Sequence, residues 1–195
     1  GVKAIGAQTT ELPLVTLSLT IPGGHILQAN DTSKIGLAGM FASMMNEDTK
    51  NYTAEKFQAE LQKLGSSVSV GSGFDGISFS IQTLKKNLDK TLALLEERML
   101  NPKFTQAAFD RIQKQNIEGF KQAKAQPAFV ASDVFDKMNY GTSILGLSAS
   151  GTEYTIKNMK LSDVEGYYNN YMTSQDAELV IVGDVTESEI LGKLG

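Results

Sequence analysis

One short segment constrains the fold of this chain more than any other. Residues 36–46 read GLAGMFASMMN, a sequence that predicts a helix with almost no polar surface. A helix that is apolar on all sides lies inside a protein. Glycine within a helix costs about 1 kcal/mol relative to alanine, so packing must stabilise this segment. Only Ser43 and Asn46 could take part in chemistry here, and the small residues beside them would let other backbone approach closely.

Composition sets the class of protein and excludes several functions. The chain has 195 residues, a net charge of −4, no cysteine and one histidine, His25. This length suits a single domain over residues 1–195. The negative charge argues against a nucleic-acid partner, because phosphate binding needs a concentrated positive field. The apolar runs are too short to span a bilayer. Without cysteine there is no thiolate ligand or nucleophile, and one imidazole severely limits a metal site or a catalytic triad.

Periodicity along the chain predicts an α+β fold. Alternating apolar residues predict strands over 12–21, 66–71, 76–83 and 177–182. Apolar residues three and four apart predict helices that begin at Thr53, Thr83, Thr105 and Ser162, with a shorter one after Pro127. Since the strands run as a meander and the helices arrive in blocks, we expect an antiparallel or mixed sheet packed against a layer of helices.

Capping residues indicate where several helices start. Residues 31–33, Asp-Thr-Ser, offer N-cap chemistry for the buried segment, and Ser162–Glu165 is a capping box. Thr186–Glu189 is a second capping box, but its helix reaches Gly195 after a few residues. A helix that begins and is not completed suggests that the chain is a piece of a longer protein.

In the order and spacing of its segments the chain resembles the insulinase/pitrilysin zinc peptidases, the inverzincin family to which the mitochondrial processing peptidases are related. The catalytic motif of this family is His-x-x-Glu-His. The resemblance covers nearly the whole chain, in the segments 12–17, 36–45, 64–83, 100–104, 150–158, 167–171 and 179–185. The last of these, LVIVGDV, recurs in the family and is fairly specific to it.

The resemblance places the catalytic motif on the buried segment. The two histidine positions fall on Gly39 and Ser43, and the glutamate between them falls on Ala42. The third zinc ligand, a glutamate on a later helix, falls on Gly119. Zinc hydrolysis needs three protein ligands, an open position for water and a carboxylate base, and these residues supply none of them. The resemblance therefore implies a domain with no catalytic residue, no cofactor and no metal.

The family also implies a role and partners. We expect the non-catalytic half of a zinc metallopeptidase, which forms part of the substrate chamber and supports an active half of the same fold. Zinc is expected in that catalytic partner domain, on the same chain or on another subunit, and the substrate is an extended peptide. The domain alone is then no enzyme, although its parent protein is a zinc metalloendopeptidase of the periplasm or cell envelope. The alternative is a scaffold or assembly subunit of the same fold with no role in proteolysis.

Three polar residues are isolated candidates for a chemical role. His25 could be a lone metal ligand, but a histidine that follows two glycines is expected to be a solvated turn residue. Ser43 could be a nucleophile, but it has no base nearby and is expected to face the core. Glu118 could replace the lost ligand from the neighbouring position, although one helical step rotates a side chain by about 100°. A different enzyme chemistry would need a polar constellation that this sequence lacks.

Three further groups have a structural and a functional interpretation. The apolar cluster within residues 40–45 could be an adaptable methionine-rich interface, but core packing is the stronger expectation. The glycine-rich segment 71–76 has no lysine and no following helix, so a hairpin connection is preferred to a phosphate-binding loop. A peptide-contacting patch could be formed by Tyr167, Tyr168, Asn169, Asn170 and Tyr171, or these residues could simply alternate between core and surface.

Overall fold

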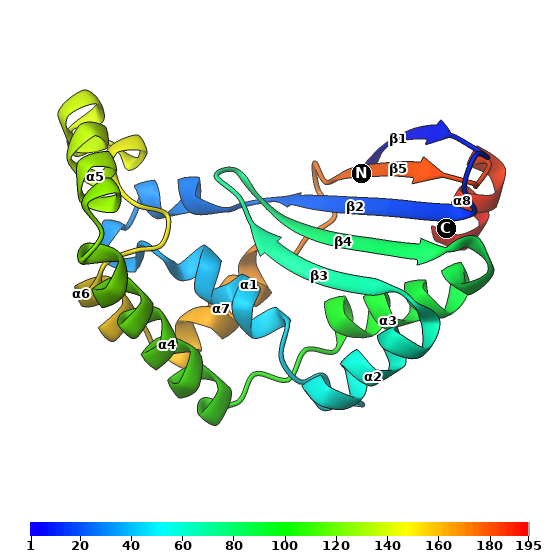
Figure 1. Cartoon of the computed structure of the whole chain (residues 1–195), viewed down its shortest axis with the longest axis horizontal. Coiled ribbons are helices and arrows are strands. Elements are labelled where there is room, and N and C mark those ends of the chain that lie inside the picture. The colour runs from blue at the N-terminus through cyan, green and yellow to red at the C-terminus, as the bar shows by residue number, and fades with distance from the viewer. Residues whose placement is uncertain (195) are drawn as a thin grey trace.

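The computed structural model describes residues 1–194 and contains one five-stranded sheet (Figure 1). The strands lie in the order β1-β5-β2-β4-β3. Their bounds are Lys3–Gln8 for β1, Leu14–Pro22 for β2, Ser67–Ser72 for β3, Gly76–Leu84 for β4 and Glu178–Gly183 for β5. β1 pairs parallel with β5, whereas the other neighbours are antiparallel. The predicted mixed sheet is confirmed, but its strand order is not a simple meander and β1 was not foreseen.

Helices cover one face of this sheet, as the prediction of an α+β fold required (Figure 1). Their bounds are Leu37–Met45 for α1, Ala54–Leu64 for α2, Leu88–Leu100 for α3, Gln106–Lys124 for α4, Pro127–Tyr140 for α5, Glu153–Lys157 for α6, Leu161–Tyr171 for α7 and Glu187–Leu194 for α8. Short 3-10 turns cover His25–Ala29, Thr32–Lys34, Lys85–Asn87 and Ile144–Gly146.

The two faces of the sheet differ in chemistry because side chains alternate along each strand. On β2, Val15, Leu17 and Ile21 are buried against the helices. The opposite face carries a band of hydroxyl groups, in which Ser18 pairs with Ser80 across the two strands at 3.3 Å between their oxygens. The sheet therefore has one packed face and one face with a polar band.

α1 lies at the centre of the core, where it contacts β3, α4 and α7. Phe41 and Met44 are fully buried, and Met40 and Met45 are 1% exposed. Core packing of the apolar cluster, the stronger expectation from the sequence, is confirmed.

Several predicted helix starts are wrong by a few residues. Asp31 caps the short turn before α1 rather than α1 itself, whose N-cap is Gly36. The helix expected from Thr83 begins at Leu88, because β4 continues to Leu84 through its pairing with β2. The predicted box at Ser162–Glu165 is wrong, because α7 begins at Leu161 and it is the Asp163 carboxylate that accepts a hydrogen bond from the Lys160 N–H. The box at Thr186–Glu189 is confirmed by reciprocal hydrogen bonds.

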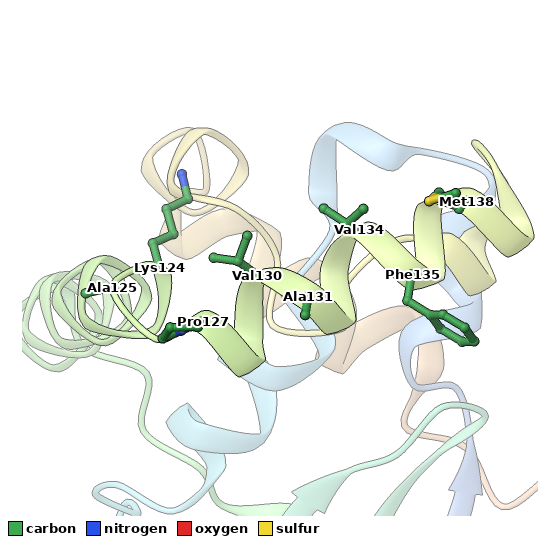
Figure 2. A pocket seen from close by; sticks show the side chains of 8 residues that line it. All are labelled: Lys124, Ala125, Pro127, Val130, Ala131, Val134, Phe135 and Met138. Carbon is green, nitrogen blue, oxygen red and sulfur yellow. The ribbon is translucent and has the colours of Figure 1, made fainter.

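α5 departs most from the rest of the helix layer. It lies at one end of the molecule, beyond the end of α4 (Figure 1). None of its side chains, all of which are described, is buried. Figure 2 shows Val130, Val134 and Met138 along one side of this helix, beside an open groove. Their exposed fractions are 44%, 49% and 82%, so an apolar stripe at helical spacing faces away from the core.

Candidate functional site

Three of the four positions to which the resemblance assigns the lost metal ligands and base lie around a hollow between α1 and α4. The hollow has a volume of about 330 Å³, and Gly39, Ser43 and Gly119 all line it. Ala42, the fourth position, is buried with 4% exposed and does not line the hollow. The fold thus brings two positions of α1 together with one position of α4 that lies far away in the sequence.

Gly36 lines one end of this hollow, and Gly151 lies against the backbone that leads into it. Gly36 precedes α1 with a φ of 97°, and a Cβ there would lie 3.1 Å from the Ser150 carbonyl oxygen. Gly151 has a φ of 78°, and a Cβ there would lie 2.6 Å from the Ile35 carbonyl oxygen. These positive φ angles favour glycine, which has no Cβ to clash. The close backbone approach expected for the small residues is confirmed at the start of α1.

The walls of the hollow offer hydroxyl and amide groups but no acid or base. The Ser43 hydroxyl donates to the Gly39 carbonyl oxygen at 2.9 Å, so it is engaged within its own helix. Gln115 and Asn116 contribute carboxamides from α4. Within residues 1–194, no three histidine, aspartate or glutamate side chains are placed to hold one metal ion. The residues of this hollow do not fit zinc, whose sites use histidine, carboxylate or thiolate ligands.

Gly39 and Gly119, two of the glycines that line the hollow, have room for a side chain. A Cβ at Gly119 would meet nothing within 4 Å. A Cβ at Gly39 would lie 3.8 Å from the Ser72 hydroxyl oxygen, which is an ordinary contact. Larger side chains can therefore start at both positions without moving the backbone.

Glu118 lies on α4 but does not line the hollow. Its carboxylate is 3.9 Å from the Lys114 ammonium, and more than half of its side chain is exposed. The rotation by one helical step turns it away, as expected. The alternative in which Glu118 replaces the missing ligand finds no support in this geometry.

His25 is buried, so the expectation of a solvated turn residue is wrong. Its side chain is 3% exposed, and Nε2 lies 3.1 Å from the Ile144 carbonyl and 2.9 Å from the Leu147 carbonyl. Because both partners are acceptors, Nε2 carries the proton and donates. His25 therefore links the 25–29 turn, which follows β2, to residues 144–147, and the glycines before it do not indicate this distant partner.

Two tyrosines of α7 also have structural partners. The Tyr167 ring stacks on Phe41 with centroids 4.6 Å apart, and its hydroxyl accepts from the Gly24 N–H at 3.0 Å. Burial raises the pKa of Tyr167 to about 12, although the Gly24 hydrogen bond acts in the opposite direction. The Tyr168 hydroxyl donates to the Met99 carbonyl at 2.8 Å. Of the proposed peptide-contacting patch, Asn169, Asn170 and Tyr171 are exposed.

Asn46 joins α1 to the edge of the sheet, a role that local sequence patterns do not reveal. Its carboxamide contacts both backbone groups of Val70 and the Arg98 guanidinium. Arg98 is 4% exposed and its guanidinium carbon lies 4.0 Å from the Phe57 ring centre. Burial lowers the pKa of Arg98 to about 10, against the opposing charge of Glu47.

Comparison with known proteins agrees with the resemblance and places the chain in a family. The sequence profile described as Insulinase (Peptidase family M16) matches residues 4–148. The chain belongs to the M16 family. Among curated relatives, the non-peptidase homolog YmxG of Helicobacter pylori is 26% identical over 183 residues, which are 94% of this chain and 42% of YmxG. The zinc protease PqqE of the same organism is 24% identical over 164 residues, covering 83% of this chain and 37% of PqqE.

Solved structures share the fold over almost the entire chain. The M16 inactive domain from Pseudomonas fluorescens superposes with a TM-score of 0.91 at 23% identity, covering 99% of this chain and 47% of that one. The periplasmic protease PqqL from Escherichia coli gives 0.82 at 18% identity, covering 97% of this chain and 22% of that one. This M16 chain therefore spans less than half the length of these relatives. None of the helices in residues 1–194 combines the length and hydropathy needed to cross a membrane.

Proposed function

We propose that this M16 chain is a non-catalytic domain that packs beside a catalytic domain of the same fold and forms part of a chamber for peptide substrates. The observation that carries this proposal is the hollow between α1 and α4, where Gly39, Ser43 and Gly119 stand at the positions assigned to metal ligands. A glycine, a serine and a second glycine cannot replace two histidines and a glutamate.

Ala42, which stands at the position of the motif's glutamate base, supports the same proposal. A zinc-bound water attacks a peptide only when a nearby carboxylate can take its proton. The buried methyl group of Ala42 cannot do so. Zinc and the general base accordingly belong to the partner domain, and no step of hydrolysis takes place on this chain.

The comparisons support the division into two kinds of domain. The Pseudomonas fluorescens structure is described as an M16 inactive domain, and one Helicobacter pylori relative is named a zinc protease. Because the chain matches less than half of each, a same-fold partner is expected on the remaining length or on a separate subunit. The periplasmic location of PqqL leads us to propose the periplasm or cell envelope for this protein as well.

A reconstitution experiment tests this proposal. The protein is purified and mixed with the His-x-x-Glu-His domain from the same source, and cleavage of quenched fluorescent peptides is recorded. We expect no cleavage by the protein alone, stoichiometric binding of the two, and faster cleavage by the mixture than by the catalytic domain. Cleavage by the isolated protein, with one tightly held zinc per chain by elemental analysis, would end the proposal.

A second candidate is a scaffold subunit with no part in proteolysis. The specific observation in its favour is the similarity to YmxG, which is named a non-peptidase homolog. Binding to a partner without any change in peptide cleavage would favour this candidate over the first.

A further inference from the structure

β3 is an outermost strand of the sheet, with β4 on one side and no strand of residues 1–194 on the other (Figure 1). An edge strand presents unpaired N–H and C=O groups to which another strand can add. Natural proteins usually protect such an edge with lysine, proline or a bulge. The β3 sequence, SVSVGS, has no charge and no proline. Its edge needs another form of protection.

Asn46 supplies that protection at the middle of the strand. Its Nδ2 donates to the Val70 carbonyl oxygen at 2.8 Å, and its Oδ1 accepts from the Val70 N–H at 3.1 Å. The carboxamide thus bonds Val70 in the way that the backbone amide of an added strand would. Val70 lies opposite Phe79 of β4 in the register of the sheet. In an antiparallel ladder every second residue of an edge strand points its N–H and C=O groups away from the neighbouring strand, and these are the groups of Val70 that Asn46 contacts.

The remaining hydrogen bonds hold this side chain in place. Nδ2 also donates to the Ala42 carbonyl oxygen at 2.8 Å, and Oδ1 also accepts from the Arg98 Nη1 at 2.8 Å. A carboxamide has two donors and two acceptor lone pairs, so all four are used. Because Arg98 is itself buried, leaving this arrangement would strand a charged donor in the core.

We propose that Asn46 closes the β3 edge to strand addition, so that this domain takes neither an extended peptide nor a second sheet edge there. Outward groups recur at every second residue of an antiparallel edge strand. Asn46 occupies the outward N–H and C=O groups of Val70. The six-residue strand therefore has no two successive outward-facing residues whose backbone groups are both free. Peptide recognition by strand addition depends on such a row of main-chain hydrogen bonds.

The experiment compares the wild-type protein with Asn46→Ala and with Asn46→Leu, which nearly keeps the shape without donors or acceptors. Asn101→Ala is the matched control, since Asn101 also caps a helix end but bonds Glu97 instead of a strand. Amide hydrogen exchange is measured at Val70 and at core residues, which report whether each variant remains folded. The probe for strand addition is a synthetic peptide of residues 76–84, the sequence that pairs with β3 in the sheet.

We expect slow exchange at Val70 in the wild-type protein and in Asn101→Ala, and about tenfold faster exchange in both Asn46 variants. We also expect that only the Asn46 variants bind the peptide or self-associate in sedimentation velocity. Adding Ser69→Lys, an edge charge on an exposed residue, should reverse both gains. The proposal is overturned if the wild-type protein binds the peptide as tightly as the variants. It is equally overturned if the variants expose the Val70 amide and gain neither form of association.

Discussion

α1 and α5 are both rich in apolar side chains, yet they occupy opposite environments. α1 has Phe41 and Met44 fully buried beneath the sheet, whereas α5 has Val134 and Met138 largely exposed at the end of the molecule. An apolar pattern in the sequence therefore indicates a face that can be buried, but it does not indicate which part of the protein or which partner buries it. α1 is covered by this chain's own sheet and helices. The α5 face is not covered by residues 1–194.

The first test of this contrast is to truncate a large buried side chain of α1. Phe41→Ala should lower the free energy of unfolding by about 3–5 kcal/mol, because it removes buried ring area and leaves a cavity between α1 and α7. Urea denaturation followed by circular dichroism measures the change. A loss below about 1 kcal/mol would mean that α1 is not the centre of the core.

The stability of the protein at alkaline pH tests the burial of Tyr167, the side chain that packs on α1. The pKa of Tyr167 is raised to about 12 in the folded protein, against an unfolded value near 10. A folded-state pKa above the unfolded one gives stability that is complete below pH 10 and is lost as pH rises toward 12. The loss attributable to this group should be about 3 kcal/mol over that window.

Tyr167→Phe separates this effect from other alkaline changes. It should remove the Tyr167 part of the pH dependence and cost about 1–3 kcal/mol at neutral pH, because the buried Gly24 N–H loses its acceptor. Tyr171→Phe is the matched control, since that ring is 42% exposed and should change stability little. Equal behaviour of the two variants at pH 11 would contradict the assignment.

The smallest effect is expected on α5. Val134→Ser and Met138→Ser should each change the free energy of unfolding by less than about 0.5 kcal/mol, because both side chains already contact solvent. Thermal unfolding at several protein concentrations measures this. A large loss that grows with concentration would indicate that copies of the chain cover this face.

The sequence predicted the elements well where local patterns decide them. Hairpin strands at Val68–Val70 and Ile77–Ile81, the end of α2 at Gly65 and the burial of α1 follow from alternation, helical spacing and a left-handed cap. β1 was missed because KAIGAQ has little alternation and gains its strand conformation from pairing with β5.

The site was predictable in part. The resemblance assigned four positions, of which the fold places Gly39, Ser43 and Gly119 on one hollow but not Ala42. His25 and Asn46 could not be assigned, because their partners at Ile144, Leu147, Val70 and Arg98 become neighbours only through the tertiary fold. Local sequence indicates which groups a residue carries, and long-range packing decides which of them meet.

We infer that the hollow between α1 and α4 retains the shape of a metal site and lacks the side chains. Its most direct test is zinc binding by the triple variant Gly39→His, Ser43→His, Gly119→Glu, measured by elemental analysis and isothermal titration. The double variant without Gly119→Glu keeps Glu118 as the neighbouring carboxylate and serves as the control. We predict no stoichiometric zinc in the wild-type protein, weak binding at most in the double variant, and one zinc per chain in the triple variant. A folded triple variant that binds no more zinc than the double variant would contradict the account.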